Sequence, residues 1–126
     1  MTVNHHRPVN LDLGSLKFPP MAIASILHRI SGLVLFILLP IMMYFLSQSL
    51  ASRASYDHLQ VLLTQFHIKL LFWAFTTALL YHVLAGLRHI VMDMGFGEQL
   101  VVARRSSMTV ILIAFIMAIF LGIWIC

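Results

Sequence analysis

The chain has 126 residues, of which 61% are hydrophobic and only 10% are charged. A soluble globular domain carries roughly 45–50% apolar and about 25% charged residues. The composition therefore excludes a water-soluble fold and predicts a membrane protein. The net charge of +4 comes from basic residues scattered singly between apolar runs, which is typical of membrane topology rather than nucleic-acid binding. The single cysteine, Cys126, excludes an internal disulfide, a zinc or redox cysteine pair, and an iron–sulfur cluster held by this chain alone.

Three stretches are long and apolar enough to cross a bilayer. Ile30–Leu50 and Ser106–Cys126 contain no Asp, Glu, Lys, Arg or His, and Leu70–Leu87 contains only His82. A spanning helix needs roughly 20 apolar residues at about 1.5 Å each. The sequence predicts an all-α membrane protein with one membrane-anchor domain over residues 1–126, comprising an N-terminal segment (1–20) and transmembrane helices over about 21–50, 61–93 and 105–126.

The basic residues predict the orientation of these helices. The N-terminal flank contributes Arg7, Lys17 and Arg29, the link between the second and third spans contributes Arg88, Arg104 and Arg105, and the remaining loop contributes Arg53 and Lys69. The side richer in Lys and Arg faces the cytoplasm, so we expect a cytoplasmic N-terminus and a periplasmic C-terminus. The first 20 residues have no apolar core typical of a signal peptide and no transit-peptide pattern. This favours a multi-pass protein of a bacterial inner membrane.

The start of the first span carries a polar edge. Ser25, His28 and Arg29 are three and four residues apart, so they share one edge of an otherwise apolar helix. One interpretation is an interfacial arginine and histidine that reach the lipid headgroups. The other is a binding edge, because a hydroxyl and a cation one turn apart suit the carbonyl oxygen of a quinone.

The second span contains a histidine within the membrane. An ionisable residue there is a candidate functional site by default, although a neutral imidazole bonded to a neighbouring helix is the simpler alternative. Gly86 and His89 follow His82 on the same helical face, four and seven residues on. Gly86 leaves room for a large flat group such as haem; ordinary close helix packing is the alternative explanation.

The predicted topology brings these two clusters to the same side of the membrane, because the first helix leaves the cytoplasm and the second returns to it. A haem ligated by His82 would then direct its propionates toward His28 and Arg29.

Three segments resemble the succinate dehydrogenase cytochrome b family, the larger membrane anchor of bacterial succinate:quinone oxidoreductases. They are Arg7-Pro-Val-Asn-Leu-Asp-Leu13, Ser25 to Gly32, and His82-x-x-x-Gly86-x-Arg88-His89 running on to Asp93. The resemblance extends over essentially the whole chain through its length, its three spans and the order of its motifs. The segment from His82 to Asp93 is the most specific of the three.

The resemblance implies a haem b site and a ubiquinone site. In it, His82 corresponds to an axial ligand of the haem iron, whose second ligand comes from a small companion anchor subunit. His28 and Arg29 correspond to residues beside the haem propionates. Ser25 and Arg29 correspond to residues that border the quinone.

The remaining implications concern His89, Asp93 and the partner subunits. The resemblance gives His89 and Asp93 a structural or propionate-side role. It also implies an iron–sulfur subunit and a flavoprotein subunit on the cytoplasmic side, with succinate oxidised on the flavin. The chain itself has no dinucleotide fingerprint and no soluble domain, so we expect it to be a non-flavin membrane subunit of the enzyme rather than the succinate-oxidising chain.

Alternatives from other classes stay open. A small transporter would place polar residues within the spans, but usually an Asp or Glu, and none of the three spans has one. A haem-free structural anchor would have the same spans. The anchor of a fumarate reductase is the nearest alternative within the family.

Overall fold

The structure is a computed structural model that describes residues 18–126. These residues form four helices and no strand: α1 (Pro20–Ala51), α2 (Arg53–Leu63), α3 (Phe66–Asp93) and α4 (Leu100–Ile125). Of these, α1, α3 and α4 are long and apolar enough to cross a membrane. The predicted all-α fold with three membrane-length helices is thus confirmed, and the chain is a multi-pass membrane protein.

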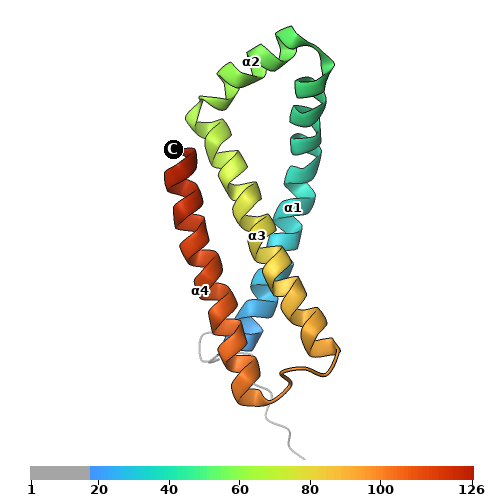
Figure 1. The fold of residues 1–126 in the computed structure, drawn as a ribbon, viewed down its shortest axis with the longest axis vertical. Helices are drawn as coiled ribbons and strands as arrows, with labels where there is room; N and C mark the ends of the chain where they lie inside the picture. Colours follow the sequence, from blue (N-terminus) through green and yellow to red (C-terminus); the bar gives the residue numbers. More distant parts are fainter. Residues whose placement is uncertain (1–17) are drawn as a thin grey trace, which may run out of the picture.

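The three long helices run side by side with alternating direction (Figure 1). The starts of α1 and α4 and the end of α3 lie at one end of the bundle, together with the connection between α3 and α4. We refer to this end as the linker end. The opposite end holds α2 and the C-terminus, and we refer to it as the α2 end.

The helices pack through small side chains. Apart from Leu59 and Tyr81, the buried residues of the described chain are alanines and serines: Ala24, Ser31, Ala85, Ala103, Ser107 and Ala114. Most large apolar side chains point outward, as expected where lipid surrounds a bundle. Small residues let helix backbones approach closely within a membrane, where no hydrophobic effect drives helices together. Five of these six small buried residues lie in the halves of α1, α3 and α4 nearer the linker end, and Ala114 lies just past the middle of α4, so the close packing is concentrated toward that end.

The structure differs from the expected helix over 61–93. The chain forms α2 up to Leu63, turns at Thr64 and Gln65, and begins α3 at Phe66. The turn contains neither glycine nor proline; its backbone N–H groups bond carbonyls three residues back instead. The Asp57 carboxylate of α2 would be costly inside the hydrocarbon core, which favours a position of α2 outside it.

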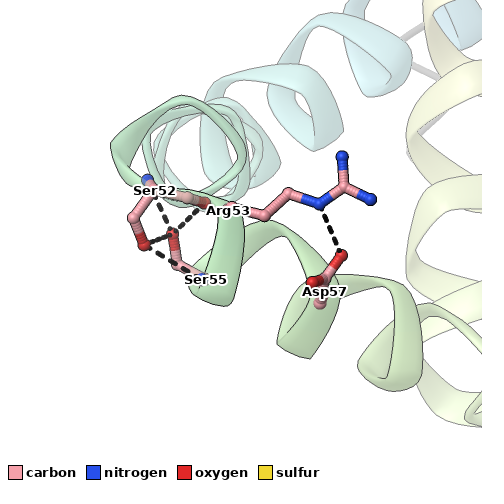
Figure 2. Close-up of polar contacts among 4 residues, drawn as sticks. All are labelled: Ser52, Arg53, Ser55 and Asp57. Carbon is pink, nitrogen blue, oxygen red and sulfur yellow. Dashed lines mark hydrogen bonds and ion pairs between the residues drawn. The ribbon is translucent and has the colours of Figure 1, made fainter.

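Ser52 separates α1 from α2. Its backbone is extended, and its hydroxyl accepts a hydrogen bond from the Ser55 N–H at 3.1 Å, while the Ser55 hydroxyl accepts from the Ser52 N–H (Figure 2). This reciprocal capping satisfies N–H groups that a helix start leaves unbonded. Arg53 and Asp57 add an exposed ion pair at 3.4 Å. The α1–α2 junction is thus stabilised by local contacts.

The end of α3 is a glycine-terminated Schellman motif. Gly95 has a φ of 89°, and the N–H of Phe96 bonds the Val91 carbonyl while that of Gly95 bonds the Met92 carbonyl. The connection then leads to α4, which begins at Leu100, earlier than the expected 105. The chain thus stays at the linker end of the bundle between the end of α3 and the start of α4.

Candidate functional site

Three histidines converge at the linker end of α1 and α3. The rings of His28 and His82 stack with their centroids 4.2 Å apart and an interplanar angle of 15°. The His89 ring lies 5.2 Å from that of His28 and is tilted by 52°. The structure therefore brings together, from two helices, the histidines that the sequence placed in separate clusters.

The contacts of the His82 ring favour one of its two tautomers. Its Nδ1 lies 3.2 Å from the backbone carbonyl oxygen of His28 and 3.1 Å from the Ser31 hydroxyl. A carbonyl oxygen can only accept, so both contacts are hydrogen bonds in the tautomer that carries its proton on Nδ1. The other nitrogen, Nε2, then keeps a lone pair, which is the form of histidine that ligates a metal.

Gly86 lies against the His28 imidazole. A Cβ atom added to Gly86 would lie 3.5 Å from Nε2 of His28. The space beside this glycine therefore accommodates the His28 imidazole, which packs between His82 and His89. Gly86 also lines the groove described next, and the expectation that it leaves room for a flat cofactor stays a prediction.

A groove of about 640 Å³ runs along this cluster. It is lined by His28, His82, Val83, Gly86, Leu87, His89, Ile90 and Asp93. Nε2 of His28 is buried and has no hydrogen-bond partner among the described residues. A buried polar atom without a partner is unfavourable, so this nitrogen is suited to a polar group supplied from outside the described chain.

Ser25 and Arg29 lie on an adjoining part of α1. Ser25 is partly buried and Arg29 is exposed. Neither Ser25 nor Arg29 is among the described residues that line the histidine groove. The structure thus places the suggested quinone edge near the groove along α1 but outside its walls.

Arg88 forms its hydrogen bonds with α4 rather than with the histidines. Its Nε donates to the Ser106 hydroxyl at 3.0 Å, and its Nη2 donates to the Ala103 carbonyl at 3.0 Å. Both partners are on α4. Arg88 therefore shares the linker end with the histidines but joins α3 to α4.

The sequence reasoning gave no role to Ser31 or to Tyr81. The buried Ser31 contacts His82, and the Tyr81 hydroxyl donates to the Ala24 carbonyl at 2.8 Å. Ser31 lies three residues after His28, hence on the same face of α1, and this spacing could have indicated it. For Tyr81 we find no comparable signal.

The donor set fits one axial position of a haem. Among residues 18–126, no group of three or more His, Cys, Asp or Glu side chains is arranged to hold a metal ion. His82 instead offers a single ring nitrogen with an oriented lone pair, and the buried His28 nitrogen lacks a partner. One such ligand with hydrogen-bonding groups beside it is the arrangement that a haem with its carboxylates can use.

Comparisons with known proteins agree with these features. Residues 3–121 match the family described as "Succinate dehydrogenase/Fumarate reductase transmembrane subunit". The succinate dehydrogenase cytochrome b556 subunit of Coxiella burnetii is 49% identical over 98% of this chain and 99% of its own length. The protein of the same name from Paracoccus denitrificans is 28% identical over 90% of this chain and 88% of its own length. A cytochrome b560 subunit from Porphyra purpurea is 26% identical over 93% and 95%.

The matched span includes α1 and α3, the two helices that carry the clustered histidines, and most of α4. It also includes residues 7–13, the first segment of the resemblance, which lies outside the described residues. The chain belongs to the family of succinate dehydrogenase/fumarate reductase transmembrane subunits.

Proposed function

We propose that this chain is a haem b- and ubiquinone-binding membrane anchor of a succinate dehydrogenase, the respiratory complex II. The observation that carries the proposal is the state of His82. Its Nδ1–H is held by acceptors on α1, which leaves the Nε2 lone pair free for iron. The relatives named cytochrome b subunits support the same assignment.

His82 is the proposed axial ligand from this chain, and a small companion anchor subunit supplies the second. When bound, the haem adds a one-electron carrier within the low-dielectric interior of the bundle. The unpartnered Nε2 of His28 and the guanidinium of Arg29 are the proposed contacts of the propionates. His89 and Asp93, which line the same groove, have a structural or propionate-side role.

Ser25 and Arg29 are the proposed quinone contacts. They lie one turn apart near the start of α1. A hydroxyl and a fixed positive charge at this spacing can bond the quinone carbonyl oxygen and stabilise negative charge as electrons arrive.

The partners follow from this division of labour. The described residues include no soluble domain, so succinate oxidation belongs to a flavoprotein subunit and electron delivery to an iron–sulfur subunit. Both are proposed to dock at the linker end. The excess of Lys and Arg at that end favours a cytoplasmic position for it, and the proposed location of the chain is the inner membrane of a bacterium.

The experiment that tests the haem assignment compares His82→Leu with His89→Leu in the purified complex. His82→Leu should abolish or strongly perturb the b-type reduced-minus-oxidised spectrum, while the helices still assemble because their small-residue packing is intact. His89 lies seven residues further along α3, about 10 Å nearer its end, so its removal should have a milder effect. Exchanged effects of the two variants would reassign the ligand.

The same spectrum separates this function from a haem-free structural anchor, for which the wild-type complex would show no b-type bands. The family description also includes fumarate reductases, whereas the relatives compared above are succinate dehydrogenases. We therefore propose succinate oxidation as the working direction. Rates of succinate oxidation and fumarate reduction by the same preparation test this choice.

A further inference from the structure

Ser31 is positioned to act on His82 as a hydrogen-bond acceptor. It is only 6% exposed, and its hydroxyl donates to the His28 carbonyl at 2.7 Å. A hydroxyl has one hydrogen, and this bond uses it. Toward Nδ1 of His82, at 3.1 Å, the Ser31 oxygen can therefore only accept.

The N–H of His82 is shared between two acceptors on α1. One is the Ser31 oxygen, and the other is the His28 carbonyl oxygen at 3.2 Å. Removal of the Ser31 hydroxyl would leave the carbonyl in place, so the proton would stay on Nδ1. The N–H would, however, lose the nearer of its two acceptors.

Gly32 lies against the edge of the same ring. A Cβ atom added there would lie 3.1 Å from Cε1 and 3.5 Å from Nδ1 of His82. The first distance is tighter than an ordinary carbon–carbon contact, so a side chain at Gly32 would push the imidazole aside. The ring orientation therefore depends on two consecutive residues of α1, one by hydrogen bonding and one by having no side chain.

We propose that Ser31 and Gly32 are positioning residues for the His82 imidazole and that Ser31 tunes the haem that His82 ligates. The proposal rests on the haem ligation proposed above. When the ring nitrogen of a histidine that does not face the metal donates a hydrogen bond, that bond fixes the orientation of the ring and raises the basicity of the ligating nitrogen. A more basic ligand stabilises ferric iron relative to ferrous iron, so the Ser31 contact lowers the reduction potential of the haem.

The test compares Ser31→Ala with Ser47→Ala in the purified complex. Ser47 is a matched control, because it too lies on α1 and donates to the carbonyl three residues back, at 2.8 Å, but contacts no part of His82. Three properties are measured: the EPR spectrum of the oxidised haem, its midpoint potential, and the rate at which haem is lost to an acceptor protein.

Ser31→Ala should keep its haem, lose it roughly tenfold faster, and show a raised midpoint potential. A tenfold loss of preference for ferric iron corresponds to about 59 mV for one electron. Ser31→Thr, which retains a hydroxyl, should restore the potential toward the wild-type value. If Ser31→Ala matches Ser47→Ala in all three measurements, the proposal is overturned.

Gly32→Ala separates orientation from hydrogen bonding, because it leaves the Ser31 hydroxyl in place. It should shift the EPR g-values, which depend on the orientation of the axial rings. If Ser31→Ala does not assemble, this variant decides, and an EPR spectrum identical to wild type overturns the proposal. His82→Leu, measured alongside, separates a failure of the proposed haem ligation from a failure of the positioning role. If His82→Leu retains its haem, the ligation by His82 is refuted, whereas the contacts of α1 with the ring are not.

Discussion

The two ends of the bundle hold their helices together in different ways. At the linker end, polar side chains reach from one long helix to another. The Tyr81 hydroxyl of α3 bonds the Ala24 carbonyl of α1, and Arg88 of α3 bonds Ser106 of α4. Such bonds fix how far each helix is rotated and how deep it lies.

At the α2 end, polar contacts are mostly local. Ser52 bonds Ser55 and Arg53 pairs with Asp57, in each case within one helical turn (Figure 2). Trp73, which donates to the Ala118 carbonyl, is a contact between long helices on this side. Local bonds stabilise a segment without fixing the spacing of its neighbours.

The contrast shows at which end the relative position of the helices must be fixed. The stacked rings of His28 and His82 come from different helices, so their geometry survives only if α1 and α3 keep one register. A site assembled from several elements requires such support from the contacts around it. The α2 end only has to return the chain across the membrane.

The largest expected effect concerns which side of the membrane each end occupies. Cys126 is exposed at the α2 end. A membrane-impermeant thiol reagent should label it from the periplasmic side of intact cells, because the basic residues favour a cytoplasmic linker end. Cys126→Ser serves as the control and should remain unlabelled. Labelling that requires broken membranes would reverse the orientation.

The next effect is loss of quinone reduction at the linker end. Ser25→Ala and Arg29→Leu each remove a proposed bond to the quinone. Loss of a charge-assisted hydrogen bond costs about 1.5–3 kcal/mol, or roughly one to two orders of magnitude in rate. Succinate:quinone activity should fall by that factor, while electron transfer from succinate to a water-soluble dye should persist in the assembled complex.

Arg53→Leu is the matched control from the α2 end, since Arg53 is also an exposed arginine near a helix start and its ion pair is exposed too. It should leave quinone reduction unchanged. Arg29→Leu should in addition shift the haem spectrum, and Ser25→Ala should not. Normal quinone reduction in both linker-end variants would leave Ser25 and Arg29 as an interfacial edge only.

The same contrast explains what could be predicted from the sequence. The membrane-length helices follow from apolar runs, and the shared face of His82 and His89 follows from helical periodicity. The division between α2 and α3 carries no glycine or proline, so the expected helix wrongly began near residue 61. Periodicity within one helix also says little about which side chain of an adjacent helix packs against a given residue.

Two linker-end contacts illustrate that limit. The sequence did not indicate that His28 packs beside Gly86. Nor did it indicate that the Arg88 side chain bonds α4. Both outcomes depend on the rotation of one helix against another, which is set by small buried residues spread over three helices.

A smaller effect should follow from Arg88→Leu. The substitution removes the hydrogen bonds to Ser106 and Ala103 that join α3 to α4, and hydrogen bonds between membrane helices contribute about 0.6 kcal/mol each on average. The Ser106 hydroxyl keeps its own bond to the Ala103 carbonyl, so no partner is left unsatisfied there. The thermal stability of the detergent-solubilised complex should fall.

Arg104→Leu makes the same charge change on an exposed residue of α4 and should have little effect on stability. The haem spectrum of Arg88→Leu should match wild type, because Arg88 does not line the histidine groove. A large spectral change would mean that the α3–α4 contact also controls the histidine geometry, and that the linker end is more tightly coupled than we infer.

The smallest effect is expected from Trp73→Phe at the α2 side of the bundle. The substitution removes the 2.8 Å bond to the Ala118 carbonyl, which as a helical carbonyl of α4 still has its partner four residues on. Hydrogen bonds between membrane helices average about 0.6 kcal/mol, so thermal stability should fall only slightly. The haem spectrum and quinone reduction should be unchanged, because Trp73 lies more than two helical turns before His82 on α3. A change in the haem potential here, with Ser47→Ala silent, would show that the α2 end also sets the register of the histidines.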